Sequence, residues 1–384
     1  MKLIHLSDLH LGKRVNEFSM LEDQKDILNK IIAVIEKEQP DAVLIAGDVY
    51  DKSVPSAEAV ELFDEFLVQL ANTKTQVFII SGNHDSAERL AFANRLIDAS
   101  GIHLAPVYRG EIKPLTLQDA FGDVHFYLLP FVKPMHVRRY FPDEEITNYD
   151  DAMRVVVGNM KINPNERNIL ITHQFVTGAL VSDSEELSVG GTDQVSAENF
   201  KDFDYVALGH LHRPQNIKNE KTGSVIRYSG TPLKYSFSEA ADQKSITIIE
   251  LKEKGDISLS FRDLTPLHDM VEIKGTYSEL TRKSYYEEHA DLRESYLHIT
   301  LLDEEDILDT AAKLRIIYPY LMKLDYDNTR TRTQQSIEPL EEADTRTPLE
   351  LFGAFYEMQN GQEMSKEQSD YMRELIEKIW EVES

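Results

Sequence analysis

Five short segments of this sequence combine acidic, amide and imidazole side chains at spacings that suit metal binding. In Asp-x-His and His-x-His pairs, both side chains project from the same side of an extended backbone, so each pair can reach one cleft. Neutral imidazoles together with ionised carboxylates suit Mn, Fe or Zn. The residue types therefore predict a site for divalent metal ions. The segments are Asp8-Leu9-His10, Gly47-Asp48, Gly82-Asn83-His84-Asp85, Thr172-His173 and Gly209-His210-Leu211-His212.

Each segment lies directly after a short apolar run, and such runs are typical of buried strands. The carboxyl ends of strands in α/β sheets face the ligand crevice, so these strand ends should deliver polar side chains to one edge. Glycines beside several of these residues permit tight turns there. The expected strands cover residues 3–7, 42–46, 77–81, 168–172 and 204–209. The predicted metal ligands are Asp8, His10, Asp48, Asn83, His173, His210 and His212.

Helical patterns separate the first three strands, with apolar residues recurring on one stripe. They cover roughly residues 20–38, 56–71 and 87–99. This alternation of strands and helices predicts a layered α/β core. Further strands are expected at 124–130, 225–229, 245–251 and 256–261.

The pattern changes near Pro266, which predicts a boundary after a core of residues 1–265. Residues 266–326 indicate a small α+β module. Residues 327–347 carry few large apolar groups and have the composition of a linker. Residues 348–384 follow as two helical patterns with apolar faces.

The composition narrows the class of protein. The sequence contains no cysteine, which excludes disulfides and thiolate metal ligands. No apolar run approaches the roughly 18 residues that span a bilayer, and the start resembles no signal peptide, so a cytoplasmic location is expected. The formal net charge of -26 conflicts with direct binding of a polyanion. If nucleic acid is the substrate, metal ions or a partner protein must supply attraction.

The ordered set Asp-x-His, Gly-Asp, Gly-Asn-His-Asp, a strand-end His and Gly-His-x-His resembles the signature of calcineurin-like metallophosphoesterases. The resemblance covers roughly residues 1–265 and implies two stacked mixed β-sheets flanked by helices. It implies that Asp48 bridges two metal ions. One ion would bind Asp8, His10 and His212, and the other Asn83, His173 and His210. All seven positions are filled in this sequence.

Two-metal chemistry then predicts the reaction class. Two nearby cations neutralise phosphodiester oxygens and activate a water for in-line attack, without a covalent intermediate. His84, directly after a predicted ligand, is the candidate acid or phosphate stabiliser. Asp85 is expected to orient His84 by accepting an N–H bond, with a turn cap as the alternative role.

Longer segments resemble the SbcD family of nucleases. They include HLSDLHLGKR, GDVYDKSVPS, GNHDSAERL, SVGGTDQV and YSGTPLKYSFSE. This resemblance implies manganese-dependent double-strand 3'-5' exonuclease and single-strand or hairpin endonuclease activity, with Mg²⁺ or Fe²⁺ as other possible metals. It implies a homodimer and an SbcC-like ATPase of the SMC class, giving a two-plus-two assembly that acts on DNA ends at the nucleoid. Relatives carry His where this sequence has Asp51, which leaves the role of that position open.

Contacts with macromolecules can also be assigned from the sequence. DNA contacts are expected at Lys13, Arg14, Lys52 and Arg89. The apolar residues beyond the need of one sheet contact predict a dimer interface at Leu62, Phe63, Phe66, Leu90 and Leu96. Docking of the ATPase partner is expected at Phe352, Phe355, Tyr356, Ile376, Ile379 and Trp380.

Two other functions are compatible with parts of this pattern. One is a small-molecule phosphodiesterase on the same core, which the added module after residue 266 and the terminal helices disfavour. The other is a non-catalytic scaffold, which the complete set of predicted ligands disfavours.

Overall fold

A computed structural model of the chain places its helices and strands. It describes residues 1–91, 100–183, 185, 194–218, 223–305, 307–329, 331, 348–360 and 363–382. Among these residues, no helix is both long enough and apolar enough to cross a membrane. The chain divides into two compact units: Met1–Leu301 with Ile307–Asp325, and Leu302–Asp306 with Tyr326–Ser384.

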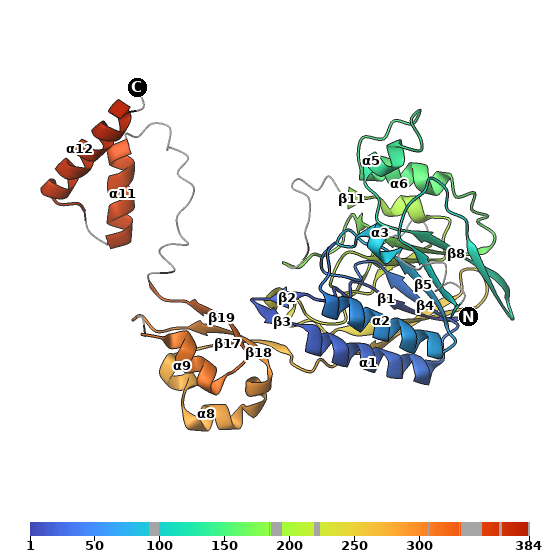
Figure 1. The fold of residues 1–384 in the computed structure, drawn as a ribbon, viewed down its shortest axis with the longest axis horizontal. Helices are drawn as coiled ribbons and strands as arrows, with labels where there is room; N and C mark the ends of the chain where they lie inside the picture. Colours follow the sequence, from blue (N-terminus) through green and yellow to red (C-terminus); the bar gives the residue numbers. More distant parts are fainter. Residues whose placement is uncertain are drawn as a thin grey trace. The chain divides into compact units, whose positions relative to one another are not determined.

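The first unit contains two six-stranded mixed sheets, as the sequence predicts (Figure 1). In the first sheet, β1, β4, β5 and β6 run parallel, and β15 and β16 add an antiparallel edge. The strand order is β16-β15-β1-β4-β5-β6. The bounds are β1 Lys2–Leu6, β4 Ala42–Ala46, β5 Gln76–Ile80, β6 Ile102–Ala105, β15 Ser245–Leu251 and β16 Ile257–Asp263.

The second sheet has the order β13-β14-β12-β9-β8-β7. Its central strands β8, β9, β12 and β14 are parallel, and both edges are antiparallel. The bounds are β7 Leu115–Asp119, β8 Gly122–Leu129, β9 Arg167–His173, β12 Tyr205–Gly209, β13 Gln215–Asn216 and β14 Val225–Tyr228. The strand ends that carry the predicted ligands therefore belong to both sheets.

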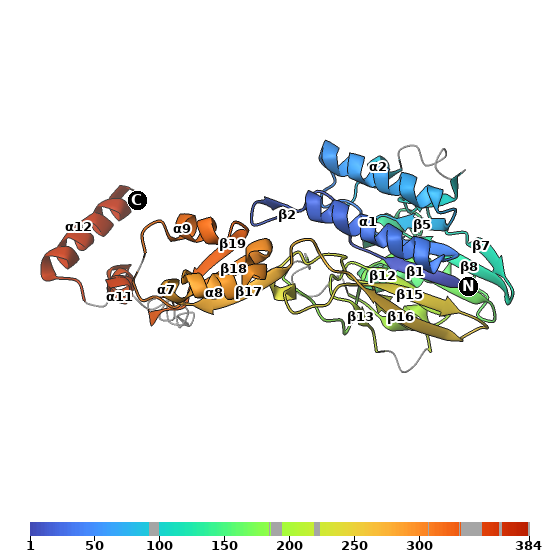
Figure 2. The same ribbon diagram turned by 90° about the horizontal axis from the view of Figure 1, so that it is seen from below.

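Alternating side chains of the central strands are buried on both faces. In β4, Leu44 packs between the two sheets, whereas Val43 and Ile45 face the helices outside the first sheet. Helices α1 (Leu21–Glu38) and α2 (Ala57–Asn72) cover that outer face (Figure 2). Helices α5 (Pro134–Arg138) and α6 (Tyr149–Gly158) cover the second sheet. Each buried aliphatic side chain contributes about 1.5–3 kcal/mol, so these three layers hold the strand ends rigidly in place.

Short elements complete this part of the fold and connect its loops. A hairpin of two short strands follows β1, and only four residues of the helix expected at 87–99 are described, as α3. The bounds are β2 Arg14–Val15, β3 Phe18–Ser19, α3 Ala87–Leu90, β10 Phe175–Val176, β11 Gln194–Val195, η2 Ala197–Phe200 and η3 Phe237–Glu239.

The segment after residue 266 folds as an α+β module with a three-stranded sheet in the order β17-β18-β19. It is anchored to α1 because Asp23 accepts hydrogen bonds from the Tyr296 hydroxyl at 2.6 Å and the His268 amide at 2.9 Å. The domain boundary at residue 266 stays a prediction, since this module clusters with the core in one compact unit. The bounds are β17 Met270–Gly275, α7 Tyr277–Leu280, α8 Lys283–Glu288, η4 Ala290–Glu294, β18 Tyr296–Leu301, α9 Thr310–Ile317 and β19 Leu321–Tyr326.

The second unit contains two helices, α11 (Pro348–Asn360) and α12 (Lys366–Val382). They contact each other, and Gln368 Nε2 donates to the Tyr356 hydroxyl at 2.9 Å. Among the predicted partner-docking residues, Phe355 is 54% exposed, and Phe352, Tyr356 and Ile376 are half-buried. The side chains of Ile379 and Trp380 lie outside the described residues, as does most of the expected linker.

The predicted dimer contacts require a correction. Leu62, Phe63, Phe66 and Leu90 are buried inside the single chain, in the cluster between the first sheet and its helices. Both faces of α2 that carry them meet other apolar groups of the same chain, so ordinary core packing accounts for these residues. The fifth residue, Leu96, lies outside the described residues.

Candidate metal centre

The loops after β1 and β4 pair with each other and carry three of the predicted ligands. The Asp8 amide donates to the Gly47 carbonyl at 3.0 Å, and the His10 amide donates to the Asp48 carbonyl at 2.9 Å. Asp8, His10 and Asp48 have positive φ angles of 53°, 45° and 48°. Non-glycine residues in this region are strained, and they concentrate at functional sites. The hydrogen bonds between the loops therefore hold these side chains where an isolated loop would not.

Two glycines allow neighbouring strand ends to approach this loop pair. A Cβ atom at Gly82 would lie 2.1 Å from Asp48 Oδ1, and one at Gly209 would lie 1.9 Å from the Ala46 carbonyl oxygen. No side chain fits at either position without moving the backbone. The loops after β5 and β12 can therefore close on β4 only because these residues are glycine.

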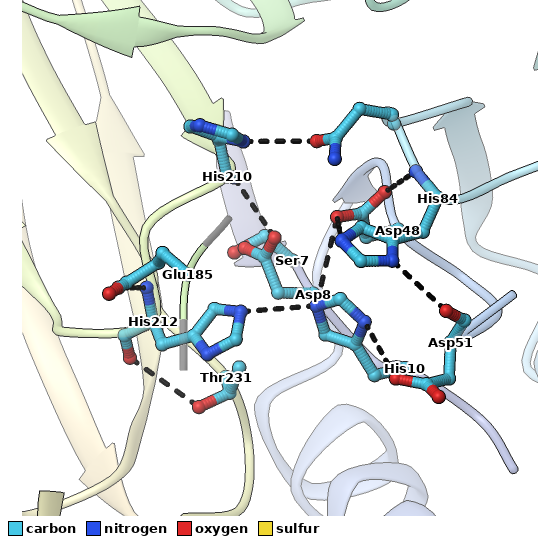
Figure 3. A network of polar contacts seen from close by, with 12 residues as sticks. Ser7, Asp8, His10, Asp48, Asp51, His84, Glu185, His210, His212 and Thr231 are labelled. Atoms are coloured by element: carbon cyan, nitrogen blue, oxygen red, sulfur yellow. Dashed lines mark hydrogen bonds and ion pairs between the residues drawn. The ribbon is translucent and has the colours of Figure 1, made fainter. Parts of the chain in front are cut away.

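The first group of predicted ligands is Asp8, His10 and His212, whose ligand atoms lie within 4.8 Å of one another. All three side chains are buried, and His10 Nε2 lies 3.1 Å from His212 Nε2 (Figure 3). Only one proton can lie between two ring nitrogens, whereas a cation can accept both lone pairs. Asp8 Oδ2 is also buried, with no hydrogen-bond partner among the described residues. Buried polar atoms are normally satisfied, so this group fits a metal ion.

The second group is Asn83, His173 and His210. Asn83 Oδ1 lies 3.0 Å from His173 Nε2 and 3.0 Å from His210 Nδ1. His173 Nδ1 contacts the Ala46 carbonyl oxygen at 2.8 Å. A carbonyl can only accept, so Nδ1 carries a proton and Nε2 is the nitrogen that faces the group. Such a bond commonly fixes the orientation of a metal-binding histidine.

The Asp48 carboxylate lies between the two groups. Its Oδ2 atom is 3.7 Å from His10 Nε2 in the first group and 3.3 Å from His173 Nε2 in the second (Figure 3). Side chains from two sheets thus converge on one place, with carboxylates, imidazoles and one amide as donors. This donor set fits two divalent ions with Asp48 shared between them.

Burial and mutual contact shift the pKa values of these groups. Burial raises the pKa of Asp8 to about 6. For Asp48, burial alone would raise the pKa, but His173 and His10 outweigh it and hold the pKa well below its usual range. For His173, burial alone would lower the pKa, but the Asp48 carboxylate outweighs it and raises the pKa to about 9. Without metal, His173 and Asp48 therefore form a buried ion pair, whose proton must leave when the imidazole binds a cation.

His84 lies beside the site without belonging to either group of ligands. Its Nδ1 atom donates to the Asp51 carbonyl oxygen at 3.0 Å, which leaves Nε2 facing the site, 4.0 Å from Asp48 Oδ2. The side chain is 19% exposed, more than the buried ligands around it. This geometry suits a group that reaches a bound phosphate.

The predicted role of Asp85 as the residue that orients His84 is wrong. Its carboxylate accepts hydrogen bonds from the backbone amides of Gly82, Val49 and Tyr50, at 2.9, 3.1 and 2.9 Å. These three bonds use its oxygens to brace the loops after β4 and β5. The backbone carbonyl of Asp51 orients His84 instead, a contact that depends on the path of the chain and not on a side chain.

A buried carboxylate behind His212 was not predicted. Glu239 is fully buried, and its Oε1 atom lies 3.7 Å from His212 Nδ1. Its Oε2 atom accepts a hydrogen bond from Lys244 Nζ at 2.6 Å, and Lys244 also donates to the His212 carbonyl at 2.9 Å. Burial would raise the pKa of Glu239, but His212 and Lys244 hold it well below its usual range. The only sequence signal was the position of Glu239 at the end of the YSGTPLKYSFSE segment.

Gln24 of α1 is a second residue that sequence reasoning missed. Its side-chain amide donates to the His10 carbonyl at 2.8 Å and accepts from the Gly12 amide at 2.9 Å. The Tyr235 hydroxyl donates to the Leu9 carbonyl at 2.7 Å and accepts from Gln24. These bonds hold the loop that carries the first Asp-x-His pair.

The predicted DNA-contacting residues differ in their availability. Lys13 Nζ is 2.8 Å from Asp51 Oδ1, so its charge is already paired. Arg14 is exposed and donates to the Glu17 carbonyl, and Lys52 and Arg89 are also exposed. Their contacts with DNA stay predictions.

Comparison with known proteins agrees with this fold and site. A family model described as "Calcineurin-like phosphoesterase" matches residues 1–214. A second, described as "Type 5 capsule protein repressor C-terminal domain", matches residues 266–360. Among solved structures, a dimetal phosphatase from Danio rerio is 12% identical and covers 69% of this chain and 96% of its own, with a TM-score of 0.42. At that score the likeness carries no argument about the site.

Two curated relatives match almost the whole chain. The SbcD subunit of the nuclease SbcCD from Staphylococcus epidermidis is 34% identical over 383 residues, which are 98% of each chain. The corresponding nuclease subunit from Staphylococcus saprophyticus is 33% identical over 389 residues, with 99% of each chain covered. The chain therefore belongs to the calcineurin-like phosphoesterases and, within them, to the SbcD family of nucleases, which are metal-dependent hydrolases.

Proposed function

We propose that this protein cleaves DNA as a double-strand 3'-5' exonuclease and as an endonuclease on single strands and hairpins. It uses two divalent ions, of which Mn²⁺ is the expected one. The observation that carries this proposal is the convergence of seven metal-ligand types around Asp48, which lies 3.7 Å from His10 and 3.3 Å from His173. Family membership adds the nuclease class.

The residues of this chain would divide the work of cleavage. Asp8, His10 and His212 hold one ion, Asn83, His173 and His210 hold the other, and Asp48 holds both. When bound, the ions would supply positive charge for the phosphodiester and a water activated for in-line attack. His84 Nε2 is positioned to donate a hydrogen bond to a phosphate oxygen or a proton to the leaving oxygen, because Nδ1 is committed to the Asp51 carbonyl.

The proposed partner is an ATPase of the SbcC type, as the description of the relatives indicates. The terminal helices support this assignment, since Phe355 is 54% exposed and Tyr371 is 66% exposed on a pair of helices that forms its own compact unit. We further propose a homodimer. On α2 its contacts would involve the exposed Val60 and Val68, because the larger apolar residues of that helix are buried.

The net charge of -26 argues for weak DNA binding by the isolated chain. Each phosphate contact adds affinity through release of counterions, and the best-placed cation, Lys13, is already paired with Asp51. Bound metal ions and the ATPase partner would therefore supply much of the attraction.

A nuclease assay with Mn²⁺ tests the proposal on a hairpin DNA, a blunt duplex and a cyclic nucleotide, with and without the ATPase partner. We expect cleavage of both DNAs by the wild type, none by Asp8→Ala, and loss of turnover with retained metal binding in His84→Gln. Arg373→Gln, in the terminal helices, is the control and should cleave like the wild type. Hydrolysis of the cyclic nucleotide without cleavage of DNA would favour a small-molecule phosphodiesterase instead.

A further inference from the structure

A cavity of about 460 Å³ adjoins the metal centre. Asn83 and Asp85 line it near the metal centre, and residues between Phe131 and Tyr140, after β8, line another part. We call it the flanking cavity. Because Asn83 belongs both to this cavity and to the second group of ligands, a substrate bound at the metals would continue directly into it. The volume lies within the range of small-ligand sites, roughly 300–1,000 Å³.

Two cations in the flanking cavity lack an acidic partner. Lys133 and Arg139 are exposed, and no carboxylate of the described residues lies within ion-pair distance of either. The cavity also contains Asp85 and Glu88, but three backbone amides occupy Asp85, and Glu88 accepts a hydrogen bond from Ser86. In a chain with 67 acidic and 41 basic residues, unpaired cations beside a metal centre are favourable sites for an anion.

An aromatic ring stands beside these cations in a fixed position. Tyr140 packs against Gly110, where a Cβ atom would lie 2.6 Å from the ring, and makes an edge contact with Tyr108 at 5.6 Å. Gly110 has a φ angle of 85°, so glycine is favoured there on two counts. The Arg139 guanidinium lies over the ring at 6.0 Å. Tyr140 nevertheless remains 40% exposed, which leaves room for a planar ligand.

We propose that the flanking cavity binds an unpaired nucleotide of the DNA strand that is being cut. Lys133 and Arg139 would contact the phosphate that neighbours the scissile one, and the base would stack on Tyr140. Sites for single strands combine cations along the backbone with aromatic rings that stack on bases, whereas bases in a duplex are already stacked on each other. This inference rests on the proposed function and names the form of DNA that the site prefers.

The test measures binding of a fluorescent thymidine oligonucleotide to the full chain by anisotropy, in EDTA and at several salt concentrations. For Lys133→Ala/Arg139→Ala we expect the slope of log affinity against log salt to shrink by about 1.4, since each single-strand phosphate contact contributes about 0.7. Tyr140→Ala should weaken binding roughly 5- to 100-fold without changing the slope, and Tyr140→Phe should restore it.

Arg138→Ala is the matched control. It removes the same charge from the same segment, but Arg138 does not line the cavity and donates to the Ile146 carbonyl at 2.8 Å. The proposal is overturned if the double variant keeps the slope of the wild type, if Tyr140→Ala binds normally, or if a blunt duplex loses as much affinity as the single strand. Cleavage of the same oligonucleotide with Mn²⁺ tests the proposed function separately, so either idea can fail alone.

Discussion

Replacing Glu239 with glutamine tests whether the unpredicted carboxylate supports both the fold and the metal centre. The substitution keeps the size of the side chain but removes the charge that faces Lys244 Nζ at 2.6 Å. Both side chains are buried, with 0% and 3% exposure. Removing one partner of a buried pair typically costs about 3–5 kcal/mol, because the other charge stays buried without compensation. Lys244 keeps its bonds to the His212 carbonyl and Thr231, so we expect the lower end, about 3 kcal/mol.

The same substitution should weaken metal binding. Glu239 lies 3.7 Å from His212 Nδ1, on the side of the ring away from the proposed metal ligand atom. Loss of a carboxylate behind a metal-binding histidine typically costs 10- to 100-fold in affinity. That corresponds to about 1.4–2.7 kcal/mol.

Urea unfolding in EDTA would measure the first effect, and Mn²⁺ titration calorimetry on the folded protein would measure the second. Glu287→Gln is the control, because its pair with Lys283 is exposed and should contribute about 0.5 kcal/mol or less. Glu239→Gln/Lys244→Met should recover much of the stability, since no uncompensated charge remains, but not the metal affinity. Unchanged Mn²⁺ affinity in Glu239→Gln would refute the role assigned at His212, and unchanged stability would refute the argument from the buried pair.

Three further outcomes follow from the geometry of the site and of the α+β module. Asp48→Asn should reduce bound Mn²⁺ from two ions to at most one per chain, measured by metal analysis after dialysis; two retained ions would contradict the shared position of this carboxylate. The Mn²⁺ affinity should rise about tenfold per pH unit between pH 7 and 9, because the pKa of His173 is raised to about 9 and its proton must leave on binding. Below pH 6 protonation of Asp8, whose pKa is raised to about 6, should steepen this dependence, and a flat titration from pH 5 to 9 would exclude both effects. Tyr296→Phe should lower the free energy of unfolding by about 1.5–3 kcal/mol, since it removes a bond to the buried Asp23 carboxylate, and urea unfolding against the exposed Tyr371→Phe would show this.

The sequence alone determined the positions of the strands and of the polar residues that follow them. Apolar runs such as 42–46 form strands for local reasons, because their alternating side chains can be buried on both faces of a sheet. The residue directly after such a run lies at a strand end whatever else the chain does. Two mixed sheets, the family and a metal-dependent hydrolase could therefore be predicted, and the fold and comparisons confirm them.

Only the tertiary structure decided which partner each of these residues has. Asp85 braces backbone amides while the Asp51 carbonyl holds His84, and Glu239 lies behind His212; no local pattern distinguishes one carboxylate from another. Likewise, Phe63 and other apolar residues of α2 belong to the core, because the first sheet and its helices surround them. Such contacts join residues that are far apart in the chain, as the bond between the His210 amide and Asp8 does across 202 positions. Spacing along the sequence carries no information about distances of that kind.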